Sequence, residues 1–557
     1  MKVLLVYPNL FGMNMLPPAI GILNSCLLRE GHQTALFDTT TYSDWGSIDS
    51  DKLKEERLNA RPFDDRLLRQ NEKHGSPSED FTRKVREFSP DLLAFSVTED
   101  MYPNALELLR ALDPRDRPRV VAGGVFPTFA PELALRKSEG MIDYLLTGEG
   151  ETTLPELCRR LESGRDVATI PSICFLKKDG SFQRNPLPMV VDPNEVPLPN
   201  YDFFEESRFY RPMQGKVWRM FPVETIRGCP YTCAYCNSPS QIVIHTDAKQ
   251  KFFRKTRVQR VREQLVYLRD RYKPDSFYFW ADTFLAVTDA EFEEFCDMYS
   301  EFKLPFWIQT RPETVTRHKF ERLKEAGVLR VAFGVEHGNE QFREKVLLRR
   351  IDNETVVNNL NILHELGVPF SVNNIMGFPR ETRSLAFDTI ELNRRIRSDG
   401  MNAYSFTPFH GTPLRTMAEL LGYVKPGEIT RSIMKPTMLR MPHWSKEEIE
   451  GLRRCFVIYV KLPKSRWPEV KMAEQLTPEG DRVWDELRKE VLTDYMHWGD
   501  RNENDDAGRI ELEKDDFKVN DAAEASILGM VEARLKEPRP SLQHEGIPAR
   551  QPVVANN

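Results

Sequence analysis

Short apolar runs alternate with amphipathic segments along the first part of the chain. The apolar runs predict strands at residues 3–7, 34–37, 92–97, 120–122 and 142–147, and the segments between them predict helices at 20–30, at 104–112 and up to 161. A polar insertion at residues 45–88 is expected to be helical in part. Continuous apolar runs are typical of parallel strands buried on both faces. The order predicts a doubly wound parallel sheet over residues 1–185, with ligands at the carboxyl ends of its strands.

A proline-rich stretch at residues 186–222 interrupts this alternation. It lacks helical periodicity and is typical of a stiff, extended spacer, so we place a domain boundary there. The alternation resumes over residues 223–414, with strands predicted at 224–227, 276–280, 306–310, 331–335, 370–376 and 403–407. Six strands with intervening helices predict a partial, TIM-type (β/α)6 barrel, whose active site lies at the carboxyl ends of the strands.

The rest of the chain divides into two parts. Residues 415–500 have a helical pattern, with helices predicted at 415–421, 446–459 and 478–492, and form a small helical domain. Residues 501–557 are largely polar with a proline-rich end, which predicts a largely disordered tail that carries at most one helix.

Composition and charge narrow the class of protein only slightly. Hydrophobic residues make up 40% of the 557 residues and charged residues 29%, as in ordinary soluble proteins. The net charge of −6 gives no overall attraction to nucleic acid or to an anionic membrane. No apolar run approaches the roughly 20 residues that a membrane span needs. We therefore expect a cytoplasmic protein with no nucleic-acid partner and no membrane span.

Three of the eight cysteines, Cys229, Cys233 and Cys236, lie within eight positions of one another, just after a predicted strand. Thiolates are the usual ligands of iron–sulfur clusters, and three thiolates would leave one iron of a 4Fe-4S cluster open. A structural zinc site is the alternative, but it normally closes with four ligands, and the sequence has no second CxxC or HxxxH pair. A chance cluster of buried cysteines is the other alternative.

The CxxxCxxC spacing, with Tyr235 directly before the last cysteine, resembles the signature of the radical S-adenosylmethionine (SAM) superfamily. The resemblance implies that Cys229, Cys233 and Cys236 bind a 4Fe-4S cluster whose open iron chelates SAM, and that Tyr235 lies against the adenine. Reductive cleavage of SAM would then yield a 5′-deoxyadenosyl radical.

Other strand ends of the second domain carry residues where the resemblance implies contacts with SAM. The segment from Gly334 to Gly338 resembles the family's G-[IV]-E-x-G motif and contains Glu336. Asp282 and Arg311 follow the second and third strands. The segment 377–382 resembles the family's G-x-P-x-E-T turn, which is expected to form a turn and a helix cap.

The first domain resembles the Rossmann-like cobalamin-binding domain found upstream of many radical SAM domains. Its strand-end loops would line one crevice, because the carboxyl ends of parallel strands meet at one edge of a sheet. The expected cofactor-binding residues in these loops are Pro8, Asn9, Ser96, Thr98, Gly123, Gly124, Glu149 and Gly150. The domain lacks the Gly-x-Gly-x-x-Gly of dinucleotide binders. It also lacks the D-x-H-x-x-G pattern of classical cobalamin domains, which implies cobalamin bound without a histidine ligand.

The combined resemblance implies a cobalamin-dependent radical SAM enzyme, most simply a C-methyltransferase. It would move a methyl group from methylcobalamin to an unactivated carbon of a small-molecule or natural-product substrate, with electrons from a donor such as flavodoxin or ferredoxin. One alternative is a non-methylating radical SAM enzyme, such as an oxidative ring cyclase of the anaerobic magnesium-protoporphyrin type. A zinc-stabilised binding module is the alternative from another class.

Overall fold

The computed structural model describes residues 1–45 and 49–496, so the tail predicted at 501–557 lies outside the described residues. The chain folds into two compact units. Unit 1 consists of Met1–Lys52, Phe63–Arg227 and Ile244–Asp275. Unit 2 consists of Leu53–Pro62, Gly228–Val243 and the chain from Ser276 onward. Helices α2 (Ser50–Glu56) and α9 (Ser238–Asp247) each contain residues of both units.

Unit 1 contains a seven-stranded sheet in the order β2-β1-β3-β4-β5-β6-β7. Its strands are β1 (Lys2–Tyr7), β2 (Gln33–Asp38), β3 (Leu92–Ser96), β4 (Arg119–Gly123), β5 (Tyr144–Leu146), β6 (Ile173–Leu176) and β7 (Phe182–Arg184). Strands β1 to β5 pair in parallel, which confirms the predicted doubly wound sheet. Strands β6 and β7 add an antiparallel edge that the sequence pattern did not predict.

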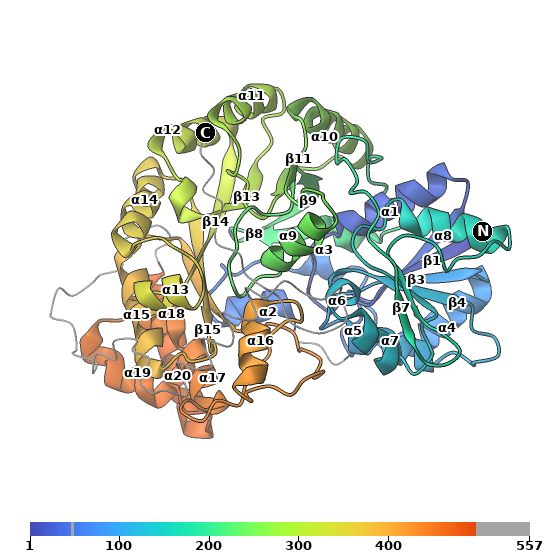
Figure 1. Cartoon of the computed structure of the whole chain (residues 1–557). Coiled ribbons are helices and arrows are strands. Elements are labelled where there is room, and N and C mark those ends of the chain that lie inside the picture. Colours follow the sequence, from blue (N-terminus) through green and yellow to red (C-terminus); the bar gives the residue numbers. More distant parts are fainter. Residues whose placement is uncertain (46–48, 497–557) are drawn as a thin grey trace. The chain divides into compact units, whose positions relative to one another are not determined.

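Helices cover both faces of this sheet, with α1 and α8 on one face and α4, α5 and α7 on the other (Figure 1). The helices of unit 1 are α1 (Pro18–Arg29), α3 (Arg66–Arg69), α4 (Pro77–Phe88), α5 (Tyr102–Arg110), α6 (Val125–Phe129), α7 (Pro131–Lys137), α8 (Thr153–Glu162) and α10 (Val258–Tyr272). Helix α4 packs through the buried Phe81, whose ring lies 5.1 Å from that of Phe37 in β2 and 6.2 Å from that of Phe95 in β3. The predicted polar insertion therefore includes one amphipathic helix of the core.

The segment predicted as an extended spacer contains regular structure. It includes the short helix η1 (Glu206–Phe209) and the antiparallel hairpin of β8 (Tyr210–Met213) and β9 (Lys216–Glu224). These elements were not predicted, because the prolines indicated an extended chain, whereas the aromatic residues that follow them supply enough apolar surface to pack. Tyr201 and Phe221 are fully buried, with ring centroids 5.9 Å apart. Aromatic packing of this kind holds the segment in unit 1.

The strand predicted at residues 224–227 is in fact two elements. Strand β9 ends at Glu224, and β10 (Ile226–Arg227) pairs antiparallel with β11 (Arg254–Lys255). The apolar run alone could not show this break, because the partner of β10 lies beyond the cysteine loop in the sequence.

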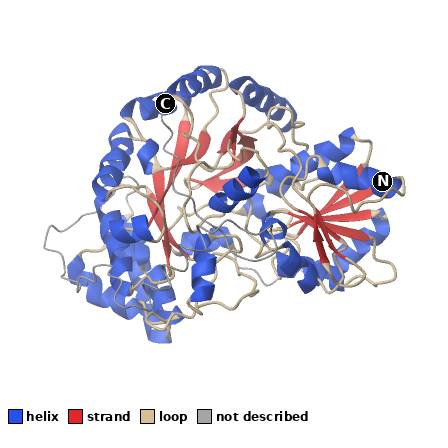
Figure 2. Cartoon of the chain, in the orientation of Figure 1, coloured by secondary structure: helices blue, strands red, loops and turns tan. Residues whose placement is uncertain are grey.

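Unit 2 contains five parallel strands in the order β16-β15-β14-β13-β12. They are β12 (Ser276–Trp280), β13 (Phe306–Thr310), β14 (Val328–Glu336), β15 (Phe370–Met376) and β16 (Gly400–Ser405). The bounds of β12, β13 and β15 agree with the prediction, and β16 begins three residues earlier than residue 403. These strands curl into part of a barrel, with α11 (Asp289–Tyr299), α12 (Arg317–Ala326), α14 (Asn353–Leu366) and α15 (Arg383–Arg395) on the outer side (Figures 1 and 2).

The last described part of unit 2 is helical, as predicted. It consists of α16 (Pro413–Leu420), α17 (Lys446–Arg454), α18 (Phe456–Lys461), η3 (Lys464–Arg466), α19 (Trp467–Ala473), α20 (Pro478–Glu490) and η4 (Val491–Tyr495). The helix predicted at 446–459 is split at Cys455 into α17 and α18. None of the helices in the described part of the chain has the length and apolar character needed to cross a bilayer.

The glycine pair that ends β4 provides a test of this fold. Gly124 has φ +117° and ψ −169°, a conformation that only glycine adopts readily, and an added Cβ would overlap the carbonyl oxygen of Val97. The neighbouring Gly123 has an ordinary φ, and its added Cβ would lie 3.5 Å from the nearest atom, the carbonyl oxygen of Leu146. We expect Gly124→Ala to lower the free energy of unfolding of unit 1 by about 3 kcal/mol or more.

Gly123→Ala serves as the matched control and should cost less than about 1 kcal/mol. Urea unfolding of the two variants, followed by far-UV circular dichroism, makes the comparison. Equal losses in the two variants would contradict the strained conformation assigned to Gly124.

Candidate functional site

The three clustered cysteines lie in the loop that joins β10 to α9. Cys229 and Cys233 are buried, Cys236 is partly buried, and all three are free thiols. The backbone of the loop is held at Ala234, whose N–H donates to Leu347 O at 2.9 Å and whose carbonyl accepts from Leu414 N at 3.0 Å. The loop is therefore pinned in its middle by backbone from two other segments of unit 2.

Each of the three sulfurs has a polar neighbour. Arg311 Nη1 donates to Cys233 Sγ at 3.2 Å, and Ser238 N donates to Cys236 Sγ at 3.5 Å. Thr283 Oγ1 lies 3.8 Å from Cys229 Sγ. Donors directed at sulfur stabilise thiolate ligands and set the reduction potential of an iron–sulfur cluster. The donor set therefore fits a 4Fe-4S cluster.

Burial opposes the ionisation of two thiols in this loop. Burial raises the pKa of the Cys229 thiol above its ordinary value and raises that of Cys236 to about 12. Ligation replaces these protons with iron, as for any thiolate site. Within the described residues, no three His, Cys, Asp or Glu side chains converge closely enough to enclose a single metal ion.

Arg349 connects the cysteine loop to the end of β14. Its Nη1 lies 3.3 Å from both Tyr235 Oη and Glu336 Oε1, and its Nη2 donates to Gly334 O at 2.5 Å. Burial disfavours the cation, but Tyr235 and Glu336 raise the pKa of Arg349 above its ordinary value. Burial also raises the pKa of the Glu336 carboxyl. The predicted site residues Tyr235, Gly334 and Glu336 are thus brought together around one buried guanidinium.

Glu336 also has a strained backbone. Its φ is +73°, in the left-handed region that residues other than glycine rarely adopt, and β14 shifts register against β15 at this point. Arg380, in the predicted turn after β15, has φ +71°. Such strain persists only where the surrounding structure enforces it, and it is concentrated at binding and catalytic sites.

Arg311, at the end of β13, is held on three sides. It contacts Cys233, pairs with Glu313 through Nε at 2.5 Å and stacks on the ring of Tyr231 with its guanidinium carbon 3.7 Å from the centroid. Asp282, after β12, is exposed and lies close enough to Cys229 and Cys236 to raise the pKa of both. Both predicted residues therefore lie beside the cysteine loop.

The turn after β15 caps the same region of unit 2. Glu381 is fully buried, and its Oε2 accepts from Gly377 N at 2.7 Å and Phe378 N at 2.9 Å. Its Oε1 lies 3.2 Å from Nε2 of the buried His337. Because His337 Nδ1 accepts from Asn339 N, Nε2 carries the proton and donates to Glu381. Thr382 caps α15 by accepting from Leu385 N, as the motif predicted.

In unit 1, the predicted cofactor residues lie at the carboxyl ends of parallel strands. Pro8 and Asn9 follow β1, Ser96 ends β3 with Thr98 just beyond it, and Gly123 ends β4 before Gly124 begins α6. Asn9 is buried and donates to Thr40 Oγ1 at 2.9 Å, but its Oδ1 has no hydrogen-bond partner within the described residues. The residues of this edge therefore offer a free acceptor and a side-chain-free surface, which fit a bulky cofactor bearing amide groups.

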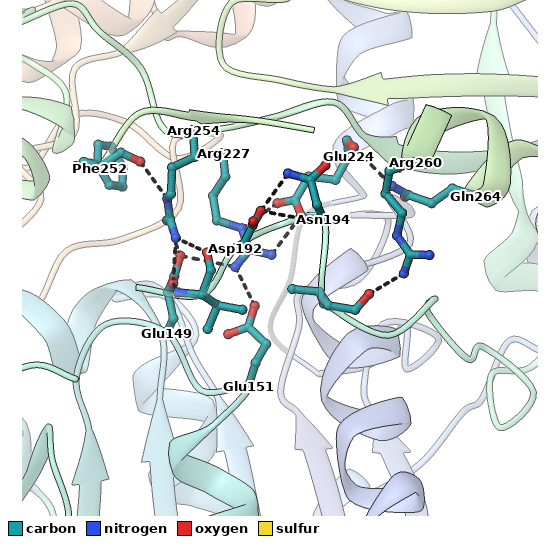
Figure 3. A network of polar contacts seen from close by, with 12 residues as sticks. Glu149, Glu151, Asp192, Asn194, Glu224, Arg227, Phe252, Arg254, Arg260 and Gln264 are labelled. Carbon is teal, nitrogen blue, oxygen red and sulfur yellow. Dashed lines mark hydrogen bonds and ion pairs between the residues drawn. The ribbon is translucent and has the colours of Figure 1, made fainter. Parts of the chain in front are cut away.

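The remaining pair, Glu149 and Gly150, lies in the loop after β5, where Glu149 belongs to an ion-pair network (Figure 3). Its carboxylate accepts from Arg254 Nη1 at 3.1 Å, Arg227 Nη1 at 3.2 Å and Val191 N at 2.9 Å. Burial opposes ionisation, yet the two arginines lower the pKa of Glu149 to about 2. The sequence predicted a cofactor contact for this carboxylate, whereas the structure shows it bound to the protein itself.

Arg227 is the centre of this network and stands two residues before Cys229. It forms a two-pronged pair with Glu224, at 2.8 and 3.0 Å, and donates to Glu151 at 2.6 Å. Burial raises the pKa of the Glu151 carboxyl.

Sequence reasoning missed Arg349, Arg227, Arg254, Tyr231 and Thr283. For Arg227 the position directly before the cysteine motif was a usable signal. No pattern marked Arg349, because its partners lie far away in the sequence.

Two family models match the chain. Residues 223–392 match the Radical SAM superfamily, and residues 62–158 match the B12 binding domain. The first match contains all three clustered cysteines, and so overturns the alternative of a zinc-stabilised binding module.

Among curated proteins, the chain is 25% identical over 389 residues to the uncharacterized methyltransferase PH0819 of Pyrococcus horikoshii, covering 69% of this chain and 82% of the relative. It is 26% identical over 401 residues to the anaerobic magnesium-protoporphyrin IX monomethyl ester cyclase of Cereibacter sphaeroides, covering 68% of this chain and 62% of the relative.

A solved structure has the same fold. It is the radical S-adenosylmethionine methyltransferase TsrM from Kitasatospora setae with cobalamin and a [4Fe-4S] cluster bound, with a TM-score of 0.55 and 18% identity, covering 76% of this chain and 75% of the other. Together with the two family matches, these features identify the chain as a cobalamin-dependent radical SAM enzyme.

Proposed function

We propose that this enzyme transfers a methyl group to an unactivated carbon of a small-molecule substrate. The observation that carries the proposal is the loop of three thiols, with Arg311 bonded to Cys233, in a chain that also has a B12-binding domain. When bound, the cluster and SAM supply a carbon-centred radical by reductive cleavage, and cobalamin supplies the methyl group. The similarity to a relative named as a methyltransferase supports methylation over other radical chemistry.

Each residue of the radical SAM domain then has a defined task. Cys229, Cys233 and Cys236 hold the cluster. Glu336 accepts hydrogen bonds from the ribose or ammonium of SAM, and Arg349 fixes the orientation of this carboxyl group and opposes the effect of burial on its pKa. Arg311 places a permanent positive charge beside Cys233, where it binds the carboxylate of SAM. Tyr235 lies against the adenine, Gly334 leaves room for the carboxylate of Glu336, and Asp282 completes the SAM contacts.

In the B12-binding domain, the strand-end loops hold the cofactor. Asn9 Oδ1 accepts from an amide of the corrin, and Ser96 and Thr98 add hydroxyl contacts. Gly123 lets the flat ring approach the backbone. Pro8, Gly124 and Gly150 shape the neighbouring strand ends, where Gly124 packs against the carbonyl of Val97. Glu149 acts indirectly, because its ion pairs hold the loop after β5 in place. A flavodoxin or ferredoxin supplies the electron.

An oxidative ring cyclisation is the second candidate. The similarity to the magnesium-protoporphyrin cyclase of Cereibacter sphaeroides favours it. The two candidates differ in the fate of SAM, because methylation consumes one SAM as methyl donor for each SAM that is cleaved, whereas cyclisation consumes SAM only as a radical source.

The cysteine loop is tested by Cys233→Ala. We expect loss of cluster iron, of the iron–thiolate absorption and of reductive SAM cleavage, because the cluster loses one of its three protein ligands. The matched control is Cys296→Ala in α11, which removes a buried thiol outside the loop. Iron analysis and 5′-deoxyadenosine assays after anaerobic reconstitution compare the variants. Full cleavage by Cys233→Ala would contradict the assigned ligands.

The role of Glu336 is tested by Glu336→Gln. A hydrogen bond to a charged group contributes about 1.5 to 3 kcal/mol, so we expect SAM to bind at least about tenfold more weakly to the cluster-loaded variant. Glu344→Gln in α13 (Glu340–Lys345) is the control, since Glu344 is an exposed carboxylate that pairs with Arg350. Equilibrium dialysis with radiolabelled SAM gives both affinities. An unchanged Kd for Glu336→Gln would remove Glu336 from the site.

The fate of SAM separates the two candidate functions. The enzyme is incubated anaerobically with a reductant and SAM carrying a deuterated methyl group, with and without cobalamin. Methyl transfer predicts S-adenosylhomocysteine that forms only with cobalamin, alongside 5′-deoxyadenosine. Production of 5′-deoxyadenosine alone under both conditions would refute methylation and favour the cyclase. Mass spectrometry quantifies both products.

A further inference from the structure

A cavity of about 300 Å³ lies in unit 1 beside the carboxyl end of β2, the edge strand of the sheet. Its walls come from β2 and the loop after it, from one face of α4 and from the segment that contains η1. This place is separate from the strand ends of β1, β3, β4 and β5 that carry the expected cobalamin contacts. The volume is at the lower limit of sites that bind small organic ligands.

The carboxylates of this cavity already have cationic or hydroxyl partners. Asp38 accepts from Arg208 Nε at 2.7 Å, and Asp80 accepts from Tyr42 Oη at 2.8 Å. Glu205 pairs with Lys73 at 2.6 Å. The fourth lining acid, Glu87, is largely exposed and lies 4.0 Å from Arg83. Each acid that lines the cavity therefore has a cationic or hydroxyl group beside it.

Three residues that line the cavity carry a donor without a partner within the described residues. Arg208 is 2% exposed, and its Nη1 forms no hydrogen bond. Thr41 is 6% exposed, and its Oγ1 is also unpaired. The Lys84 ammonium, from the face of α4 that lines the cavity, has neither an ion pair nor a hydrogen bond. A buried guanidinium nitrogen without a partner is costly, so the site favours a ligand that supplies anionic acceptors.

The other surface of the cavity is aromatic. Phe37 is buried, its ring centroid lies 6.1 Å from that of Tyr42, and the partly buried Phe203 lines the cavity from the linker side. Lys73 lies 5.2 Å from the centroid of the Tyr42 ring. Aromatic walls of this kind favour a flat apolar group, which would pack against rings.

We propose that this cavity is a binding site for a small aromatic anion, a ring that bears one carboxylate or one phosphate. The anion would accept from Arg208 Nη1, Thr41 Oγ1 and Lys84 Nζ, and the ring would lie against Phe37 and Phe203. The carboxylate and the phosphate share this recognition, because both present charged oxygen acceptors to a guanidinium.

Titration calorimetry of the full-length, cluster-loaded protein tests the site with four probes. Benzoate and phenyl phosphate are the two candidate anions, inorganic phosphate lacks the ring, and benzyl alcohol lacks the charge. We expect at least one aromatic anion to bind with a Kd below about 1 mM, and both controls to bind at least tenfold more weakly. The tighter of the two anions identifies which headgroup the site prefers.

Variants in α4 locate the binding. Lys84→Glu should weaken the preferred aromatic anion at least tenfold, and Lys84→Gln should weaken it less, whereas Arg86→Glu should leave its Kd unchanged. Arg86 is exposed on the same helix outside the cavity, so the first and third variants change the charge of α4 equally. Thermal unfolding of each variant verifies that the fold is retained.

Three results would overturn the proposal. They are the absence of binding by both aromatic anions, inorganic phosphate binding as tightly as phenyl phosphate, and equal effects of Lys84→Glu and Arg86→Glu. The second result would reduce the cavity to a site for adventitious anions. None of these readouts depends on cobalamin or on methyl transfer, so the test is independent of the proposed function.

Discussion

The geometry of the radical SAM site depends on one buried cation, Arg349. Removing a guanidinium from water costs several kcal/mol unless its donors find partners. Here Nη1 and Nη2 find them on the cysteine loop and at the end of β14, while Nε has no partner among the described residues. Tyr235, Glu336 and Gly334 are those partners. Arg349 thus couples the orientation of the cysteine loop to the strained backbone of Glu336. If either one moved, a buried polar group would lose its hydrogen-bond partner.

The same constraint operates in unit 1, where Arg227 and Arg254 form ion pairs with three acidic side chains (Figure 3). This network fixes the loop after β5 to the strand β10 that leads directly into the cysteine motif. It contains one more carboxylate than guanidinium, and burial, together with the charge of Glu149, raises the pKa of Glu151. Ion pairs therefore fix the segment before Cys229. Arg349 fixes the cysteine loop that follows it.

These two networks also explain which parts of the site the sequence could predict. Strands and their ends could be read from apolar runs, since a parallel strand buried on both faces leaves an uninterrupted signal. The cysteines could be read from their spacing. Contacts between distant residues could not be predicted from the sequence, because no local pattern records them. Arg349 and Tyr235 are 114 positions apart, and Arg254 and Glu149 are 105 positions apart. Glu149 was accordingly predicted to face a cofactor, although its carboxylate binds two arginines.

The two arginine networks can be compared with Arg208, which lines the cavity in unit 1. In both of them every acidic side chain meets a guanidinium, which is the condition under which a buried charge is tolerated without a ligand. Arg208 satisfies only part of this condition, with Nε bound to Asp38 and Nη2 to Met15 O while Nη1 has no partner within the described residues. Arg349 Nε is also without a partner among the described residues, so an unpaired guanidinium nitrogen does not by itself mark a ligand site. Arg208 differs in its position, because it lines an aromatic cavity in which an anion would complete its bonds.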